Sequence, residues 1–297
     1  MINVSIIIVN YKTKALVAQA ITSIQKFVTG FTYEIIVVDN ASHDGSAEFL
    51  KKNFPTIELI ESKENIGFGR GNNLGIKRAK GEYLFFFNSD AYLIDASILK
   101  LLQRAGEINN LGAIAPLILN PDKSIQQSGG YFPTLLKIFW WMSFIDDLPG
   151  GTFLKPYHID HDSFYKKEQQ VDWLTGAALM VPKKVLDKVG VFDSKIFMYG
   201  EDVDLCFRIK TAGFKVIISP VAGMVHIGQG SSGKAKRNAI LGEYKTILFV
   251  YQKHMGKNSL QIAKMLLKIG ALLRIGIFGL LGRKELSKTY VEAFKMA

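Results

Sequence analysis

The 297-residue chain has a single cysteine, Cys206, which excludes a framework of internal disulfides and is typical of a reducing compartment. Cys206 lies between Leu205 and Phe207, so we interpret it as a small buried apolar residue and not as a nucleophile. The opening residues, MINVSIIIVNY, have no basic region and no small-residue cleavage site. They predict an early strand instead of a signal peptide, and we expect the catalytic part to be cytoplasmic.

The sequence also lacks internal repeats, low-complexity tracts and any Pro/Gly-rich linker that would divide residues 1–230. Within that stretch, apolar runs typical of strands alternate with helical segments. The run VSIIIVN (4–10) is continuous and β-branched, the pattern of a strand buried on both faces. This alternation predicts an α/β fold with a mainly parallel sheet. The predicted strands are 4–10, 34–40, 56–62, 81–90, 111–119, 171–182 and 215–220, and the predicted helices are 13–27, 43–53, 69–80 and 200–214.

Polar side chains stand where several predicted strands end. In open α/β sheets, ligands bind beyond the carboxyl ends of the strands. Three separate strands would bring polar groups to one edge, which predicts a binding site there. The residues concerned are Asn10, Tyr11, Asp39, Asn40 and Asp90.

The segment FFFNSD (85–90) ends a strongly apolar strand with a carboxylate. Asn88 and Asp90 are two residues apart and would point the same way from an extended chain. One carboxylate is a common Mg²⁺ arrangement when substrate phosphates supply further ligands. The alternative interpretation is that Asp90 caps a helix beginning near Asp95.

A second acidic cluster, YGEDVDLCFR (199–208), contains Glu201, Asp202 and Asp204. Acidic residues at a helix N-terminus complement the helix dipole, and this structural interpretation is common. Three carboxylates in four residues exceed what capping needs, and crowding raises the pKa of some members, which suits a general base. His226 follows a strand. A lone histidine usually has a structural role, but His226 is also a plausible nitrogen ligand for a phosphate-bound metal.

Two nucleotide-binding motifs are nearly matched and are rejected. GFGRGN (67–72) lacks the final glycine of the dinucleotide fingerprint and follows the third strand instead of the first. GQGSSGKA (228–235) resembles a phosphate-binding loop, but Ala235 replaces the metal-binding hydroxyl.

Several segments together resemble glycosyltransferase family 2, especially its rhamnosyltransferase-like members. They are VSIIIVNYKT, IIVVDNASHDGS, NIGFGRGNNLGIKRAKGEYLFFFNSD, DWLTGAALMV and FDSKIFMYGEDVDLCFRIKTAGF, and they span most of residues 4–226 in the family's order. The resemblance implies a GT-A fold with a Rossmann-like sheet. The catalytic domain would be 1–230, with a nucleotide-sugar half at about 1–118 and an acceptor half at about 119–230.

The resemblance also implies roles for individual residues. Asp90 would bind Mg²⁺ or Mn²⁺ bridging the diphosphate, with His226 as a possible further ligand, and Asp202 would be the general base. Asp39 would accept the pyrimidine N–H of the nucleotide. Trp173, Gly176 and Glu201 would border the acceptor. The nucleotide-sugar site would consist of Asn10, Tyr11, Asp39, Asn40, Asn65, Gly67, Arg70 and Asn73.

The implied reaction is an inverting, metal-dependent transfer of a sugar from a dTDP- or UDP-sugar to a hydroxyl of a glycan or lipid-linked acceptor, in cell-surface polysaccharide synthesis. Rhamnose from dTDP-rhamnose is the first expectation by resemblance, ahead of galactofuranose and glucose. The sequence departs from the family at Asn88, where many relatives have a full Asp-x-Asp, and this affects the expected metal affinity.

The C-terminal tail, residues 231–297, has 13 Lys/Arg and 3 Asp/Glu, a net charge of +10 out of +11 for the chain. Lys264, Lys268 and Arg274 interrupt the apolar stretch 259–284, which makes a membrane-spanning helix unlikely. Lys257, Lys264 and Lys268 fall on one helical stripe, which predicts a basic amphipathic helix on an anionic membrane surface. The alternatives are a helix packed on the catalytic domain or a dimer interface.

Two other functions are compatible with parts of the sequence. A non-catalytic nucleotide-sugar-binding or membrane-scaffold protein could keep the fold, but the presence of Asp39, Asp90 and Asp202 argues against it. The basic tail alone would suit a nucleic-acid-binding protein. The body, however, has no basic stripe interleaved with aromatic residues, so we expect no nucleic-acid partner.

Overall fold

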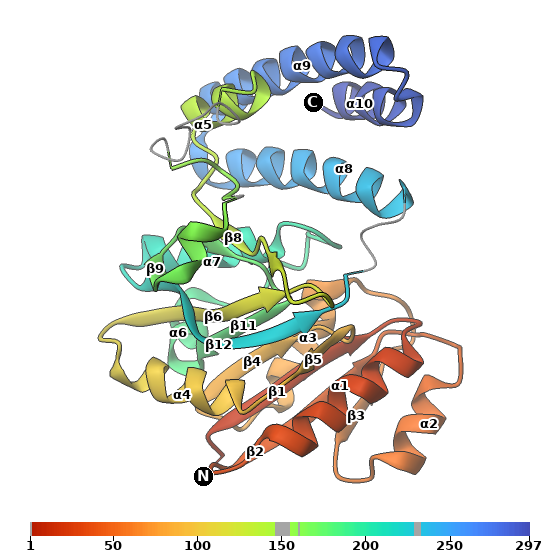
Figure 1. Cartoon of the computed structure of the whole chain (residues 1–297), viewed down its shortest axis with the longest axis vertical. Coiled ribbons are helices and arrows are strands. Elements are labelled where there is room, and N and C mark those ends of the chain that lie inside the picture. The colour runs from red at the N-terminus through yellow and green to blue at the C-terminus, as the bar shows by residue number, and fades with distance from the viewer. Residues whose placement is uncertain (1, 146–154, 160, 229–232) are drawn as a thin grey trace. The chain divides into compact units, whose positions relative to one another are not determined.

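A computed structural model describes residues 2–145, 155–159, 161–228 and 233–297 (Figure 1). The chain forms two compact units: the first comprises Met1–Gly129 and Asp160–Gly228, and the second comprises Gly130–Ile159 and Gln229–Ala297. Residues 130–159, which the sequence assigned to an acceptor half, therefore belong with the C-terminal helices. The motif at 228–235 lies largely outside the described residues.

The first unit is built on a mixed, mostly parallel sheet with the strand order β3-β2-β1-β4-β11-β6-β12-β5. Strands β1 to β4 run parallel, β11 is antiparallel to β4 and to β6, and β12 is parallel to β6. The path strands are β1 (Val4–Asn10), β2 (Tyr33–Asp39), β3 (Glu58–Glu61), β4 (Tyr83–Phe87), β5 (Ala91–Leu93), β6 (Leu111–Leu119), β11 (Ala178–Pro182) and β12 (Lys215–His226). Off this path, β7 (Ile125–Gln126) pairs with β6 and β9 (Gln169–Gln170) with β12, while β8 (Gly129–Gly130) pairs with β10 (Trp173–Leu174) in a separate small sheet.

Helices cover both faces of this sheet. Val4, Ile6 and Ile8 of β1 belong to one core cluster with the buried faces of α1 and α4, two helices on the same face of the sheet in Figure 1. Ile7 and Val9 point the other way, toward α3. The helices of this unit are α1 (Lys14–Phe27), α2 (Ser46–Asn53), α3 (Phe68–Arg78), α4 (Ser97–Glu107), α6 (Lys183–Val189) and α7 (Glu201–Thr211). The predicted α/β fold is confirmed, and the predicted strand at 171–182 is divided into β10 and β11 around Gly176.

Helix α3 lies close to β1 because glycines occupy its contact face. A Cβ atom at Gly71 would come within 2.9 Å of the Val9 side chain, and one at Gly75 within 2.5 Å of Ile7. Gly71 and Gly75 are four residues apart, so both lie on the same face of the helix. This close packing explains a glycine-rich helix that intrinsic propensity disfavours.

Replacing Gly75 with alanine is expected to destabilise the protein by about 1–3 kcal/mol, because the new methyl overpacks against Ile7. The matched control is Gly106→Ala in α4, where an added Cβ meets nothing within 4 Å. That control is expected to stabilise by up to about 1 kcal/mol through helix propensity alone. Denaturant titration measures the free energy of unfolding of both variants. Equal changes of the same sign in the two variants would contradict the packing argument.

The second unit is helical and comprises α5 (Leu135–Met142), α8 (Gly233–Val250), α9 (Lys257–Leu280) and α10 (Lys284–Met296). The buried Arg274 of α9 connects α9 to the end of α5. Its Nη1 donates to the Met142 carbonyl at 2.7 Å and its Nη2 to the Trp141 carbonyl at 2.6 Å, while the Phe144 ring centre lies 4.2 Å from its guanidinium carbon. A guanidinium suits this site because the last carbonyls of a helix carry partial negative charge.

Candidate active site

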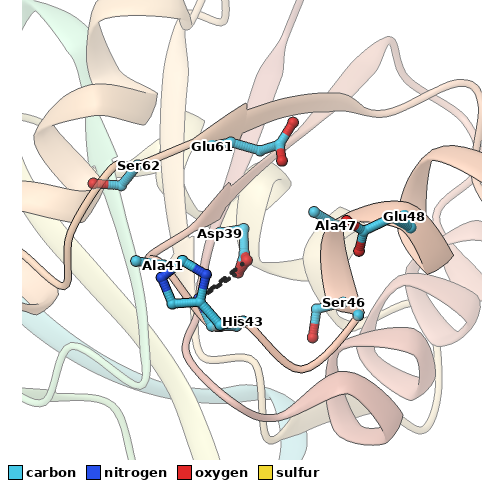
Figure 2. Close-up of a pocket in the computed structure, with 10 residues that line it drawn as sticks. Asp39, Ala41, His43, Ser46, Ala47, Glu48, Glu61 and Ser62 are labelled. Atoms are coloured by element: carbon cyan, nitrogen blue, oxygen red, sulfur yellow. Dashed lines mark hydrogen bonds between the residues drawn. The ribbon is translucent and has the colours of Figure 1, made fainter.

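The carboxyl end of β2 forms a pocket around Asp39. Asn10 and Asp39 are paired across β1 and β2, and Asn10 Nδ2 donates to Asp39 Oδ1 at 3.4 Å and to Ser42 Oγ at 3.1 Å. The Ser42 amide also donates to the Asp39 carboxylate, at 3.3 Å. Figure 2 shows Asp39 beside Ala41 and His43 in this pocket, whose volume is about 370 Å³. The lining is completed by Ser42, Gly45, Ser46, Ala47, Glu48, Glu61 and Ser62.

The loops that border the pocket hold uncommon backbone conformations. Lys12, Ala41 and His43 have φ values of 56°, 58° and 51°, in the left-handed region that non-glycine residues rarely adopt. Such strain concentrates at functional sites. Tyr11, between β1 and this loop, has 42% of its side chain exposed and is available to a ligand.

The predicted nucleotide-sugar residues in the 65–73 segment divide into two groups. Asn65 Oδ1 accepts hydrogen bonds from Asn40 Nδ2 at 2.9 Å and from the Gly67 amide at 3.0 Å, so these three residues form one network beside Asp39. Asn73, in contrast, makes two hydrogen bonds with the Phe192 backbone, at 2.8 and 3.1 Å. Arg70 donates from Nε to the Ile66 carbonyl at 2.7 Å. Arg70 and Asn73 therefore have clear structural partners, and their contact with a donor stays a prediction.

Asp90 lies against His226, the last residue of β12. The distance from Asp90 Oδ1 to His226 Nε2 is 3.1 Å. Burial acts to raise the pKa of Asp90, but the hydrogen bond and charge of His226 outweigh it and hold that pKa below its usual value. Residues Ala91–Leu93 continue as a strand, and α4 begins only at Ser97, so the alternative in which Asp90 caps a helix is wrong.

The residues around Asp90 fit a divalent cation. His226 Nδ1 lies 2.6 Å from Gln126 Oε1, to which it can donate, so a deprotonated Nε2 would be free to bind a cation beside Asp90. The Oδ1 atom of Asn88 is buried and has no hydrogen-bond partner among the described residues. Among the described residues, no group of three or more His, Cys, Asp or Glu side chains is arranged to hold a metal ion. Any cation here would depend on one carboxylate, neutral donors and ligand oxygens.

Asp202 lies in the first turn of α7 and is held by backbone amides. Its Oδ2 accepts from Gly176 N at 2.9 Å and its Oδ1 from Val203 N at 2.8 Å. Burial raises the pKa of Asp202, and these two N–H donors partly offset the rise. A carboxylate with a raised pKa is a stronger base, which suits proton abstraction from a hydroxyl.

The two neighbouring carboxylates, Glu201 and Asp204, lie in environments that differ from that of Asp202. Glu201 is only 5% exposed, and its Oε2 has no hydrogen-bond partner within the described ranges. Burial and the adjacent Asp202 charge raise the pKa of Glu201 to about 8. Asp204 is fully buried and pairs with Arg208 at 2.9 Å, which is a structural role. Trp173 lies in β10 and is partly exposed, and its contact with an acceptor, like that of Glu201, stays a prediction.

A chain of hydrogen bonds links the segments that carry Asp39, Asp90 and Asp202. Thr13 Oγ1 donates to Asn10 Oδ1 at 2.7 Å and lies 2.8 Å from Ser89 Oγ, from which it can accept, and these contacts connect the end of β2 to the segment before Asp90. Since Asn88 N donates to the Ala177 carbonyl at 3.0 Å, that segment also adjoins Gly176, the partner of Asp202.

Sequence reasoning missed several residues that hold this site together. Thr13, Ser42, Ser89 and Gln126 all make hydrogen bonds to predicted site residues or their neighbours. Ser42 and Ser89 lie inside segments that the resemblance had already marked, which was the available signal. Gln126 lies in a short strand 100 residues from His226, and nothing in the local pattern identifies it.

The fold of the chain is that of GT-A glycosyltransferases. Its fold resembles that of the Pyrobaculum calidifontis mannosyltransferase PcManGT solved with GDP-Man and Mn²⁺, with a TM-score of 0.59, 17% identity, and coverage of 99% of this chain and 86% of that one. A structure of GalNAc-T7 with UDP, GalNAc and Mn²⁺ gives a TM-score of 0.59 at 13% identity, over 90% of this chain and 54% of that one.

The family model described as "Glycosyl transferase family 2" matches residues 5–171, more than half of the chain, and the chain belongs to that family. It is 28% identical to an N-acetylglucosaminyl-diphospho-decaprenol L-rhamnosyltransferase of Mycobacterium tuberculosis, over 75% of this chain and 76% of that protein. It is 27% identical to the rhamnosyltransferase WbbL of Escherichia coli K12, over 54% of this chain and 60% of that one. The predicted family is confirmed.

The raised pKa of Glu201 predicts a pH dependence of stability. Between about pH 4.5, where the unfolded glutamate titrates, and about pH 8, the folded protein binds the additional proton. Stability therefore falls as pH rises through this range. Glu201→Gln is expected to flatten the curve and to be about 1–3 kcal/mol more stable than the parent at pH 8, with little difference at pH 5.

Thermal and denaturant unfolding from pH 5 to 9 measures this effect. The exposed Glu82→Gln serves as the control and is expected to leave the pH profile unchanged. A Glu201→Gln profile that runs parallel to that of the parent would show that Glu201 is ionised in the folded protein at neutral pH.

Proposed function

We propose that this protein is an inverting, metal-dependent glycosyltransferase that moves rhamnose from dTDP-rhamnose to a hydroxyl of a glycan or lipid-linked acceptor in cell-surface polysaccharide synthesis. The observation that carries the proposal is the chain of hydrogen bonds that links the segments holding Asp39, Asp90 and Asp202 in the first unit. The names of the M. tuberculosis and E. coli relatives support rhamnose as the sugar. The M. tuberculosis name supports a lipid-linked acceptor.

The donor would bind along the ends of β1, β2 and β4. In the Asp39 pocket, the carboxylate accepts the pyrimidine N–H, with Asn10, Tyr11 and Asn40 around the base. The network of Asn65 and Gly67 borders the sugar side of the same site, together with Arg70 and Asn73. The pocket volume of about 370 Å³ suits a nucleoside.

Asp90, His226 and the Asn88 amide oxygen would hold Mg²⁺ or Mn²⁺. When bound, the cation neutralises negative charge on the diphosphate leaving group. The PcManGT and GalNAc-T7 structures were solved with Mn²⁺, which supports a divalent metal but does not choose between Mg²⁺ and Mn²⁺ here. Gln126 would keep the His226 ring oriented by accepting a hydrogen bond from its Nδ1–H group.

Asp202 would act as the general base of a single displacement. The acceptor hydroxyl oxygen attacks the anomeric carbon while the bond from that carbon to the diphosphate oxygen breaks. The hydroxyl proton moves to the Asp202 carboxylate, and the nucleoside diphosphate leaves with the bonding electron pair. Attack from the face opposite the leaving group inverts the configuration, and Trp173, Gly176 and Glu201 would border the incoming acceptor.

Asp202→Asn is expected to reduce sugar transfer at least about a hundredfold, because the amide accepts no proton from the hydroxyl. Donor affinity is expected to persist, since Asp202 is separate from the Asp39 pocket. The assay supplies dTDP-rhamnose and Mg²⁺ or Mn²⁺ beside a panel of other nucleotide-sugars, with calorimetry for binding. Asp187→Asn on α6 is the matched control, and normal transfer by Asp202→Asn would refute the assignment.

The second unit would attach the enzyme to the inner face of the cytoplasmic membrane. No helix in the described ranges is long and apolar enough to cross a bilayer. On α9, however, large apolar side chains are exposed on one face, Ile269 by 57%. At about 100° per residue they occupy an arc of about 100°, beside the stripe of Lys257, Lys264 and Lys268. The exposed apolar positions of α9 are Ile262, Met265, Ile269, Leu272, Leu273 and Leu280.

An apolar stripe flanked by cations is the pattern of a helix lying in the interface of an anionic bilayer. The double variant Ile269→Asp with Leu272→Asp is expected to lower cosedimentation with phosphatidylglycerol-containing vesicles at least about tenfold. Asn238→Asp with Gln252→Asp makes the same charge change at exposed positions off this stripe and is expected to bind nearly as the parent. A parent dimer that the stripe variant dissociates would favour the dimer-interface alternative.

A further inference from the structure

The segment immediately before the acidic cluster exposes three large apolar side chains in a row. Phe197 is 50% exposed, Met198 49% and Tyr199 40%. Single exposed apolar residues are common on protein surfaces, whereas contiguous ones mark interaction sites. Tyr199 is three residues before Asp202, so their Cα atoms are at most about 11 Å apart.

The backbone of this 197–199 segment is fixed on the donor side. The Phe197 carbonyl accepts a hydrogen bond from the Phe68 amide at 3.0 Å, at the start of α3. Gly67 lies directly against the same carbonyl, and a Cβ atom there would overlap the carbonyl oxygen. The segment is thereby attached to the loop that follows Asn65, within the proposed donor site.

The residues that precede the segment are also held in place. Phe192 is buried and packs edge-on against Phe86, with ring centres 4.8 Å apart, and its backbone is held by Asn73. Ile196 is buried as well. The exposed side chains therefore extend from a held backbone and not from a loosely attached loop.

The turn into α7 also uses an uncommon backbone. Tyr199 has φ of 69° and Gly200 has φ of 95°, both in the left-handed region. For a tyrosine this conformation is strained and persists only where surrounding contacts impose it. Partial burial raises the pKa of the Tyr199 phenol, which is therefore protonated and able to donate a hydrogen bond at neutral pH.

We propose that Phe197, Met198 and Tyr199 form an apolar platform that binds the sugar ring carrying the acceptor hydroxyl, and so determine acceptor specificity. The inference rests on the proposed function, because Asp202 defines where that hydroxyl must lie. A sugar presents an apolar C–H face that packs on aromatic rings, and its hydroxyls can accept from the Tyr199 phenol. The hydrocarbon chain of a lipid-linked acceptor lies farther from the reacting hydroxyl than the ring that carries it.

The test compares Phe197→Ala and Met198→Ala with the parent, using methyl and octyl glycosides of N-acetylglucosamine, glucose, galactose and mannose as acceptors. For the glycosides that the parent uses, the acceptor KM is expected to rise roughly tenfold in Phe197→Ala, equally for methyl and octyl forms. Donor KM and slow donor hydrolysis by water are expected to stay unchanged. Phe197→Tyr is expected to restore the parent KM, and Val191→Ala, an exposed apolar change in the preceding loop, to leave it unaltered.

The outcomes separate the two proposals. Absence of donor binding and hydrolysis in the parent would defeat the glycosyltransferase assignment itself. Parent-like acceptor KM in both alanine variants, with hydrolysis intact, would overturn only the platform. A KM rise confined to the octyl glycosides would assign the segment to a lipid chain and overturn the sugar-ring assignment.

Discussion

The antiparallel strand β11, placed between β4 and β6, is the constraint on which the site depends. Because β1, β2 and β4 run parallel, their carboxyl ends meet at one edge of the sheet, and β11 begins at that edge because it runs in the opposite direction. Gly176 and Ala177, just before β11, therefore lie beside Asn88. The hydrogen bond from Gly176 N to Asp202 then brings the first turn of α7 to the same edge. A single strand reversal thus joins the strands proposed to bind the donor to the helix that carries the candidate base.

The same arrangement places two carboxyl groups, Glu201 and Asp202, in adjacent and poorly solvated positions. Two buried carboxyl groups this close cannot both ionise without a large free-energy cost. The two groups also differ in the hydrogen bonds that they accept. Asp202 receives two backbone N–H groups, whereas Glu201 Oε2 receives none within the described residues. Glu201, whose pKa is raised to about 8, therefore keeps its proton at neutral pH, which leaves Asp202 as the candidate base.

Much of the fold and part of the site could be predicted from the sequence. The β-branched run 4–10 and the apolar strand ending at Asp90 were identified because burial on both faces leaves a continuous apolar pattern. Asp39 and Asp90 followed from the rule that ligands bind at strand ends. Gln126 and the contact of Gly67 with Phe197 could not be predicted, because each depends on pairing between segments about 100 residues or more apart. Local patterns hold no information about such pairing.

The glycines of the first unit show how fold and chemistry depend on the same close contacts. Gly71 and Gly75 let α3 approach β1, and that approach sets the position of the α3 N-terminus. At this N-terminus, Gly67 and the Phe68 amide hold the Phe197 carbonyl, and the Phe68 ring lies against Gly176. A shift of α3 away from β1 would therefore displace the 197–199 segment and the loop that donates to Asp202 together. The packing of α3 against β1 and the geometry of the candidate base therefore depend on each other, and the glycines at these positions contribute to both.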